Sequence, residues 1–396
     1  MLRRRAFTAF VSAVIACGAL SAMGVGGVAG AHGEKVVKIG VLVPLDAGLV
    51  EFGTGIRNSV QLAVDQANKN KVIPGWEIEL VAVDDSSDPA VGVANAPQLV
   101  DDAHVIGVVG TYNSGVAEAV LPLLAPANVT LLSPSNTLSS LTLGADPANP
   151  ARPFHNYFRM VASDSEQAPF LAASVDKLGF ENVAVVSETK AVSQGLADAF
   201  VAAFTGIVTV QQTVPDGATD FSDFLEAALV EPPDAIFFGG EYQVAATLRA
   251  QATEAGFEGP IVGGDGMKDQ AYIDAAGDAS EGDFASSVGV PAAKLKTAKK
   301  FFKDYKKAGF DEPSTDYGPY AYDAANLLVL AARDALKGED EIPDDARVLV
   351  TSAVRDAKGK GVTGKLRFDE FGDTTNVVFT IYRVDGTPLE FTPIKP

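Results

Sequence analysis

The stretch that decides the fold runs from Val105 to Thr137 and reads VIGVVGTYNSGVAEAVLPLLAPANVTLLSPSNT. Two short β-branched runs, Val105–Val109 and Val129–Leu132, flank a segment whose apolar residues recur at helical spacing. This pattern predicts a strand, a helix and a second strand, joined by the polar turns Asn113–Gly115 and Ser133–Thr137. In open parallel sheets, such turns lie side by side at the carboxyl ends of neighbouring strands, where ligands bind.

The two turns favour binding of a small anion. Helix amides and small hydroxyls at such a position are hydrogen-bond donors, and the helix dipole attracts negative charge. The alternative interpretation is that small polar residues are simply good turn formers. One turn alone favours this alternative, whereas two turns beside one crossover helix support both interpretations about equally.

The composition bounds the class of protein. A chain of 396 residues can form two domains with substantial cores. Its formal charge is −20, and the first 31 residues hold three of the 31 basic residues and none of the 51 acidic ones, so a chain beginning at His32 carries −23. This charge argues against nucleic acid or an anionic membrane surface as partner, since both are polyanions.

The N-terminus has the pattern of an export signal, with the basic residues Arg3–Arg5 followed by the uncharged apolar run Ala6–Leu20. Two endings compete. Ala29–Ala31 is a small-x-small cleavage site, and Val14–Cys17 resembles a lipobox in which Cys17 would be lipidated. Cys17 is the only cysteine, so no intrachain disulfide can form. We expect an extracytoplasmic protein, either soluble or lipid-anchored, at the cell surface or in the periplasm.

Along the chain, runs typical of buried strands alternate with amphipathic segments, which predicts parallel α/β architecture. Helices are predicted at Gly55–Asn70 and Pro89–Asp101, the second kinked at Pro97. A capping box at Ser163–Glu166 predicts the start of another helix. The same alternation continues through predicted strands at Val183–Val186, Ile207–Thr213, Ala235–Phe238 and Ile261–Gly264.

From Val288 the pattern changes, with helices predicted at Lys294–Lys307 and Pro319–Leu336 and a final strand at Val377–Val384. The first of these helices carries seven lysines. Such a face is more often solvated than used to dock an acidic partner, and both interpretations stay open.

Motifs for catalysis and cofactors are absent from the sequence. His32, His104 and His155 are far apart and lack metal-ligand spacing. No GxxxxGK[ST] motif, no GxGxxG after a strand and no GxSxG elbow occurs. We therefore expect no cofactor, no metal and no enzymatic activity. Spaced histidines still allow a triad assembled in space, so a hydrolase or amidase is one alternative.

Five segments, taken in order, resemble a known family: VVKIGVLVPLDAGLVEFGTGIRNSVQLAVDQAN from Val36, VAVDDSSDP from Val81, VVGTYNSG from Val108, LLSPSNT from Leu131 and GGDG from Gly263. Together they are similar to the leucine/isoleucine/valine-binding type of solute-binding protein, which serves ATP-driven importers. The resemblance extends from Val36 to the C-terminus.

The resemblance implies the type I periplasmic-binding-protein fold: two Rossmann-like α/β lobes, each a parallel sheet flanked by helices. The chain would cross between them three times, near Val161–Ser163, Ser286–Val288 and Asn376–Thr380. We expect residues 1–31 to be the signal peptide, with the lipoprotein signal ending before Cys17 as the alternative. Residues 36–162 with 288–376 would form the first lobe, and residues 163–287 with 377–396 the second.

The resemblance also implies site residues. The family's contacts to a ligand carboxylate match Ser114, Ser135 and Thr137, and Asn136 lies between the last two. An aromatic residue that lines the first loop matches Phe52. The acid that receives the ligand's ammonium group matches Asp265. Each residue alone has an ordinary structural explanation as a helix cap, core residue or ion-pair partner.

The sequence departs from the family pattern at several positions. Val192 stands where amino-acid binders usually have a tyrosine, and Glu241 stands where an aromatic residue usually follows the Gly-Gly turn. Tyr242 comes one place later. Ser87 and Asn113 replace a cysteine pair found in some members. Losing an aromatic wall and gaining an acid predict a ligand more polar or more cationic than leucine, such as an amide or a diamino compound.

The expected function is that of an exported, monomeric binding protein. It would capture a small amino-acid-like solute (a branched-chain amino acid, an amide or a related compound) in the cleft by hinge closure and deliver it to the permease of an ABC importer. A ligand-sensing receptor subunit on the same fold is the other alternative besides a hydrolase.

We predict that Met1 to at least Ala16 is absent from the mature protein, because the basic residues and the apolar run form an export signal. Intact-mass analysis of the native protein measures where the chain begins. A start at lipidated Cys17 would select the anchored form and a start at His32 the free form. A start at Met1 would contradict the export signal.

Overall fold

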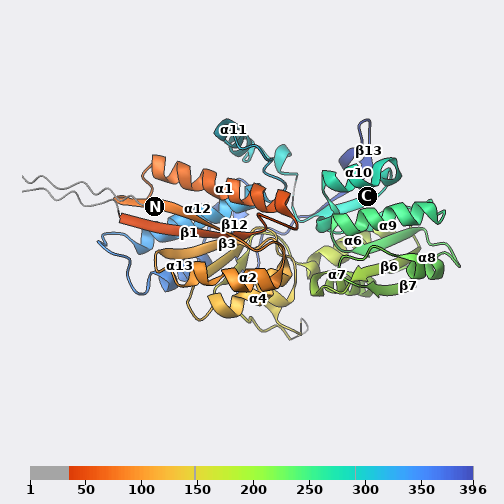
Figure 1. Cartoon of the computed structure of the whole chain (residues 1–396), viewed down its shortest axis with the longest axis horizontal. Coiled ribbons are helices and arrows are strands. Elements are labelled where there is room, and N and C mark those ends of the chain that lie inside the picture. Colours follow the sequence, from red (N-terminus) through yellow and green to blue (C-terminus); the bar gives the residue numbers. More distant parts are fainter. Residues whose placement is uncertain (1–34, 147–148, 290, 396) are drawn as a thin grey trace, which may run out of the picture. The chain divides into compact units, whose positions relative to one another are not determined.

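The computed structural model describes residues 35–146, 149–289 and 291–395. The predicted export signal, Cys17 and His32 lie outside the described residues. Within the described part, the chain forms two main sheets and a small two-stranded hairpin of β11 (Gly359–Lys360) and β12 (Lys365–Leu366). Figure 1 shows both sheets with helices on their faces.

The first sheet has five strands in the order β2-β1-β3-β4-β5, and every neighbouring pair is parallel. Its strands are β1 Lys35–Val43, β2 Trp76–Asp84, β3 Val105–Gly110, β4 Thr130–Ser133 and β5 Tyr157–Arg159. All six residues of β3 are buried, because helices cover both faces of the sheet. We call this sheet with its helices the first lobe.

Each face of the first sheet has its own helices. The helices of the first lobe are α1 Val50–Lys69, α2 Pro89–Asn95, α3 Pro97–Val100, α4 Ser114–Leu124, α5 Ser140–Leu143, α11 Lys299–Ala308, α12 Gly318–Ala335 and α13 Ala346–Arg355. Apolar residues of α1, α12 and α13 pack with one face, while those of α3 and α4 pack with the other. Helices α1 and α12 lie against each other, so segments far apart in sequence share one core.

The second sheet has seven strands in the order β14-β13-β10-β9-β8-β6-β7. Its strands are β6 Asn182–Glu188, β7 Ile207–Val214, β8 Ala235–Gly239, β9 Ile261–Gly263, β10 Phe284–Ser287, β13 Thr380–Asp385 and β14 Glu390–Ile394. The pairs from β7 to β10 are parallel, whereas β13 and β14 are added antiparallel at one edge. The predicted parallel sheet therefore forms from β7 to β10, and an antiparallel hairpin that was not predicted extends it at one edge.

The helices of the second lobe are α6 Asp164–Leu178, α7 Ala191–Ala203, α8 Ser222–Ala228, α9 Tyr242–Glu254 and α10 Gln270–Ala276. Helices α6 and α7 pack on one face of the sheet, and α8, α9 and α10 on the other. Phe200 of α7 stacks on Phe237 of β8 with ring centroids 3.8 Å apart. Burying one such side chain contributes about 1.5–3 kcal/mol.

The predicted α/β fold is confirmed, and several elements agree with their prediction in detail. The strand–helix–strand unit of Val105–Thr137 forms as β3, α4 and β4. The helix from Pro89 is interrupted before Pro97, where α2 ends and α3 begins, because proline lacks the amide hydrogen that a continuous helix needs.

Other predictions differ from the structure. Helix α1 begins at Val50, five residues before the predicted start at Gly55. The helix after Ser163 forms, but the predicted capping box is only half present. The Ser163 hydroxyl bonds the Ser165 hydroxyl (2.7 Å) and does not cap α6, whereas the Ser163 backbone amide donates to the Glu166 carboxylate. Helix α13 was not predicted. The β13–β14 hairpin was predicted only as one strand, because the Asp385–Gly386 turn signal was overlooked.

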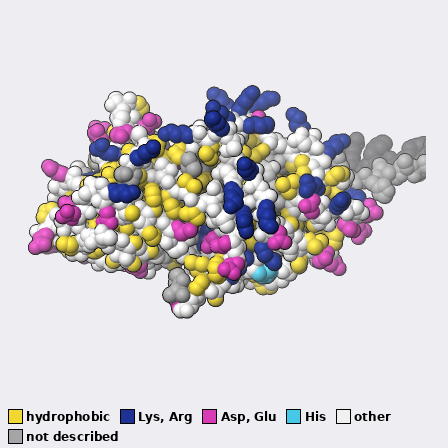
Figure 2. All heavy atoms as spheres, turned by 180° about the vertical axis from the view of Figure 1, so that it is seen from behind, with side chains coloured by type: hydrophobic (Ala, Val, Ile, Leu, Met, Phe, Trp, Pro, Cys, Tyr) yellow, Lys and Arg dark blue, Asp and Glu magenta, His cyan; other side chains and the backbone are white. Residues whose placement is uncertain are grey.

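Helix α11 begins at Lys299, later than the predicted Lys294, and a short 3-10 turn (Ala292–Lys294) precedes it. Phe301 and Tyr305 are buried against α1, while the seven lysines of this segment are exposed. Figure 2 shows Lys and Arg side chains gathered along the upper edge, where α11 lies in Figure 1. That these lysines contact an acidic partner stays a prediction.

The strands of the two sheets are consistent with three connections between the lobes. The last strand of the first sheet ends at Arg159, and α6 of the second lobe begins at Asp164. Strand β10 ends at Ser287, and β13 begins at Thr380. The residue boundaries of the lobes given above stay a prediction. Within the described residues, no helix combines the length and the apolar character needed to cross a bilayer.

One tight contact places the first turn of α1. A Cβ atom added at Gly53 would lie 1.7 Å from the carbonyl oxygen of Pro44, in the loop that follows β1. Only glycine therefore allows the helix to approach this loop so closely, and the contact fixes where the neighbouring Phe52 packs.

We predict that Gly53→Ala lowers the free energy of unfolding by at least about 1–3 kcal/mol, the usual cost of overpacking a tight site. Gly359→Ala is the control, because nothing lies within 4 Å of a Cβ at Gly359. Urea unfolding of both variants measures the difference. Equal stability of the two variants would mean that α1 and the loop separate at little cost.

Candidate ligand-binding site

A pocket lies where the carboxyl ends of the parallel strands of both lobes face each other. The cavity volume is about 160 Å³, and a single water molecule needs about 10–15 Å³ on the same scale. The pocket can therefore hold a small organic molecule. Its first-lobe lining includes Ser87, Tyr112, Asn113, Ser114, Gly115, Ser135, Thr137 and Tyr317. Its second-lobe lining includes Asp164, Lys190, Val192, Ser193, Leu196, Asp216, Glu241 and Asp265.

Four helices begin at this pocket without a side-chain cap: α4, α6, α7 and α9. The residues before them are Asn113, Ser163, Lys190 and Glu241, none of which caps its helix with its side chain. By contrast, Asp269 caps α10 outside this group. The first amide groups of a helix have no partner within the helix, so uncapped ends favour an anion.

The first-lobe wall supplies hydrogen-bond donors. The Ser114 hydroxyl oxygen accepts from the amides of Thr137 (3.2 Å) and Leu138 (3.3 Å), which leaves its proton free to donate into the pocket. The Ser135 hydroxyl instead donates to the carbonyls of Thr111 (3.2 Å) and Tyr112 (3.0 Å). Ser114 and Thr137 are thus better placed as ligand donors than Ser135, although all three line the pocket.

Asn136 does not line the pocket, in contrast to its neighbours. It is fully buried, and its amide group donates to the carbonyls of Thr111 (3.0 Å) and Tyr112 (2.7 Å). Its side-chain oxygen accepts from the Tyr157 hydroxyl at 3.3 Å. Asn136 therefore ties the turn after β4 to the turn after β3, and its role is to position Ser114 and Thr137.

Phe52 also lies behind the pocket wall and not in it. Its ring is buried and stacks on the Tyr112 ring with centroids 4.6 Å apart and planes 9° from parallel. Tyr317 meets Phe52 edge-on at 5.6 Å. Tyr112 and Tyr317 form the aromatic surface of the pocket, and Phe52 supports it. Sequence reasoning missed both tyrosines, although Tyr112 stands inside the quoted TYNSG turn.

Asp265 begins the 3-10 turn η1 (Asp265–Met267) and carries an acid into the pocket. Its carboxylate accepts from the Tyr317 hydroxyl at 2.6 Å and from the Gln167 amide at 2.8 Å. Burial raises the pKa of Asp265 to about 6, and the hydrogen bond from Tyr317 opposes part of that rise. At neutral pH the carboxylate is mostly ionised and can receive a cation.

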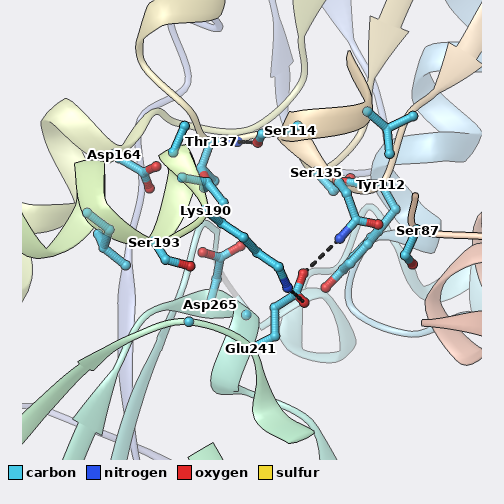
Figure 3. A pocket seen from close by; sticks show the side chains of 18 of the residues that line it. Ser87, Tyr112, Ser114, Ser135, Thr137, Asp164, Lys190, Ser193, Glu241 and Asp265 are labelled. Atoms are coloured by element: carbon cyan, nitrogen blue, oxygen red, sulfur yellow. Dashed lines mark hydrogen bonds and ion pairs between the residues drawn. The ribbon is translucent and has the colours of Figure 1, made fainter. Parts of the chain in front are cut away.

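Glu241 joins the two lobes at the pocket. One carboxylate oxygen accepts from the Asn113 side-chain amide at 2.7 Å, and the other pairs with the Lys190 ammonium at 3.0 Å (Figure 3). Lys190 also pairs with Asp216 at 2.9 Å. Burial alone would lower the pKa of Lys190, but the charges of Glu241 and Glu188 raise it, so the ammonium stays charged. Two departures from the family pattern, Asn113 and Glu241, are thus bonded to each other.

Val192 lines the same pocket in the first turn of α7 and contributes an apolar surface. It packs against the apolar cluster that includes Val116 of α4 and Leu138. The wall beside Glu241 therefore combines one aliphatic side chain with an ion pair, where an aromatic wall was expected from the family pattern.

Asp164 and Asp216 are the two acids of this pocket that sequence reasoning missed, and Asp164 was missed because it was assigned to a capping box. Asp164 is 3% exposed. Burial and the nearby charge of Asp265 raise the pKa of Asp164 to about 7. The Thr137 hydroxyl and the charge of Arg159 oppose part of this rise. Among the described residues, no group makes a well-formed hydrogen bond to either of its oxygens.

The described residues contain no candidate metal site, and their histidines lie away from the pocket. They hold no group of three or more His, Cys, Asp or Glu side chains placed to bind a metal ion. His104 contacts Asp102 at 3.1 Å and His155 contacts Asn128 at 3.0 Å, and neither histidine lines the pocket.

A pocket between two α/β lobes, lined by donors from one lobe and acids from the other, defines a small-solute binding protein. The chain belongs to the periplasmic binding protein family, whose model matches residues 36–388. This extent covers nearly all of the described residues, so the family assignment applies to both lobes.

Curated relatives match along most of their length. The Leu/Ile/Val-binding protein BraC3 of Rhizobium johnstonii is 30% identical over 358 residues, covering 89% of this chain and 92% of the relative. Leu/Ile/Val-binding protein homolog 3 of Brucella melitensis is 29% identical, covering 88% and 91%. The crystal structure of the branched-chain amino acid transporter substrate-binding protein LivJ of Streptococcus pneumoniae, in complex with isoleucine, has a TM-score of 0.77 at 26% identity and covers 91% of this chain and 100% of LivJ.

We predict that Asp164→Asn changes how stability depends on pH. The pKa of Asp164 is raised from 3.8 to about 7 in the folded protein, so between these values the folded state holds a proton that the unfolded chain has lost. The free energy of unfolding therefore falls as pH rises from about 4 to about 7, and the variant lacks this contribution.

Urea unfolding across that pH window measures the effect, and the variant should gain stability relative to the original chain as pH rises. Asp223→Asn is the control, because Asp223 is an exposed acid in the first turn of α8, away from the pocket. A stability difference that stays constant with pH would contradict the raised pKa.

Proposed function

We propose that this chain is the extracytoplasmic solute-binding protein of an ABC importer and binds a small amino-acid-like ligand between its lobes. The observation that carries the proposal is the division of the pocket into donors and acids. Uncapped amides of α4 with the hydroxyls of Ser114 and Thr137 lie on the first lobe, and Asp265 lies on the second. A zwitterion with adjacent carboxylate and ammonium groups satisfies both sides at once.

The ligand's carboxylate would bind at the start of α4. Gly115 and Val116 both line the pocket there. The Asn113 side chain bonds Glu241 instead of capping the helix, so these amides remain available to an anion. The Ser114 proton is the nearest additional donor. Ser135 and Asn136 would support this arrangement from behind through their bonds to the carbonyls of Thr111 and Tyr112.

The ligand's ammonium would bind Asp265, and its side chain would lie toward Val192 and Glu241. Val192 and Leu196 give this end an aliphatic surface, which suits a branched-chain amino acid like the isoleucine bound by LivJ. The Glu241–Lys190 pair adds hydrogen-bonding groups at the same wall. The pocket therefore accommodates a polar extension, such as an amide, better than a wall of aromatic rings would.

Binding would be coupled to closure of the lobes. The bonds that already join them include three between side chains: Asn113 to Glu241, Tyr317 to Asp265 and Lys268 to Asp316 (2.6 Å). A ligand stabilises the closed form only through contacts that the open form lacks, and a molecule touching both Ser114 and Asp265 makes such contacts. The closed form would then be what the importer's permease recognises.

We also propose that the protein is a monomer without catalytic activity and that it is held at the membrane only if Cys17 is lipidated.

A thermal-shift screen of amino acids, their amides, ureas and small carboxylates tests the proposal. A ligand at about 100 times its dissociation constant adds about 2.7 kcal/mol to the free energy of unfolding. Mass spectrometry of the released ligand should recover it unchanged. Stabilisation by none of these compounds would overturn the proposed ligand class, and a chemically altered ligand would point to an enzyme.

We predict that Ser114→Ala weakens binding of the best amino acid from this screen by about 0.5–3 kcal/mol, the range for hydrogen bonds to neutral and charged groups. Isothermal titration calorimetry measures the change. Ser174→Ala is the control, because Ser174 is equally buried but bonds the Phe170 carbonyl within α6 and does not line the pocket. Equal affinity of the two variants would place the carboxylate elsewhere.

A further inference from the structure

Asp164 occupies a costly position that the fold itself does not explain. It is the first residue of α6, it lines the pocket, and it is 3% exposed. Neither carboxylate oxygen has a well-formed hydrogen bond among the described residues. Removing a carboxylate from water without supplying donors is strongly unfavourable. Figure 3 shows this carboxylate turned inward, toward the centre of the labelled side chains.

The protein groups near Asp164 are already engaged elsewhere. The Arg159 guanidinium pairs with Asp373 at 2.5 Å and donates to the carbonyls of Asn136 (3.2 Å) and Leu138 (3.0 Å). Lys190 of the neighbouring helix α7 pairs with Glu241 and Asp216. No described cation is therefore left to neutralise Asp164.

Asp164 and Asp265 belong to one side of the pocket. Gln167, three residues after Asp164 and so on the same face of α6, donates to Asp265 at 2.8 Å. The charge of Asp265 raises the pKa of Asp164, so the two carboxylates are close enough to repel each other when both are ionised. A cation between them would relieve this repulsion and supply Asp164 with donors beyond the Thr137 hydroxyl.

We infer that Asp164 is a second ligand-binding carboxylate, which together with Asp265 receives a primary ammonium group of the ligand. This inference rests on the proposed function and names the chemistry of its cationic end. A primary ammonium has three N–H donors, and the two carboxylates together offer four acceptor oxygens, which the bonds from Tyr317, Gln167 and Thr137 do not saturate. The site should therefore select a free amine over its N-methylated forms, which lose one donor with each methyl group.

The affinity for an amine should also depend on pH in two steps. Burial raises the pKa of Asp164 to about 7 and that of Asp265 to about 6, so affinity rises with pH as each acid ionises. The charged groups that face Asp164 are Asp265 from η1 and Arg159 from β5, while Lys190 of α7 stays paired. Without Asp164, only the lower step should remain.

Calorimetry on the full mature chain tests the inference with L-leucine, L-isoleucine, L-valine, their amides and N-methyl-L-leucine as probes. We expect Asp164→Asn to weaken binding of the best free amine by about ten- to hundredfold at pH 8, the effect of losing a hydrogen bond to a charged group. Glu166→Gln is the control: it also removes an acid from the first turn of α6, but Glu166 is exposed and does not line the pocket. We expect its affinity to equal that of the original chain.

The N-methyl probe separates ligand contact from a general loss of fold. N-methylation should cost the original chain more affinity than it costs Asp164→Asn, and the thermal midpoint of the variant without ligand should be equal or higher. If Asp164→Asn does not fold, the original chain alone can test the inference. Its affinity should rise through pH 7, and it should reject N-methyl-L-leucine. If it shows neither property, the inference is overturned.

The outcomes distinguish this inference from the proposed function. If the original chain binds a probe, Asp265→Asn weakens it and Asp164→Asn does not, only the inference is overturned. If the original chain binds none of the amines, the proposed ligand class and the inference both fail.

Discussion

The binding site depends on a set of side-chain bonds that hold two turns of the first lobe together. The hydroxyl of Ser133 and the side-chain amide of Asn136 both donate to the carbonyl of Thr111, at 3.1 and 3.0 Å. Because these residues are buried, their bonds are sheltered from water, and losing one would leave a polar group unsatisfied. The turn after β3 and the turn after β4 therefore move as one unit. This unit presents Ser114 and Thr137 at a fixed spacing, which is the condition for recognising a small anion with few contacts.

On the second lobe the constraint is electrostatic. Four acids line the pocket, and they are satisfied unequally. Glu241 and Asp216 pair with Lys190, and Asp265 accepts hydrogen bonds from Tyr317 and Gln167. Asp164 has only the Thr137 hydroxyl nearby and no well-formed hydrogen bond among the described residues. The acids outnumber the one lysine in this wall, so the second lobe as a whole favours a cation. Donors on one lobe and excess negative charge on the other would orient a zwitterion before its side chain is recognised. In the proposed orientation the side chain would then meet Val192 and the Glu241–Lys190 pair.

Local sequence signals gave the fold, and the part of the site that they missed comes from packing between distant segments. The strand–helix–strand unit of Val105–Thr137 and its donor turns are encoded within 33 consecutive residues, so periodicity and turn chemistry predicted them.

Tyr317 could not be found this way, because α12 reaches the pocket only after the chain has passed through the second lobe. Asp164 was misread for a physical reason: acids near helix starts usually serve the helix itself, and only the surroundings of its oxygens reveal otherwise. Phe52 and Asn136 were predicted to contact the ligand, but neither lines the pocket, since sequence order does not distinguish a lining residue from the residue behind it.

The bonds between the lobes also bear on how the site discriminates among ligands. Asn113 and Glu241 bond each other across the pocket, and Tyr317 bonds Asp265. These contacts favour closure whatever the pocket holds, so the ligand need supply only part of the difference in free energy between open and closed forms. The Tyr317 bond is the more selective of the two, because its acceptor is also the carboxylate proposed to receive the ammonium. A ligand without a cation would leave Asp265 and Asp164 buried together in the closed form with their repulsion uncompensated, and that cost opposes closure. Discrimination in this pocket would therefore come as much from the penalty for closing on a neutral or anionic molecule as from the contacts made with the right one.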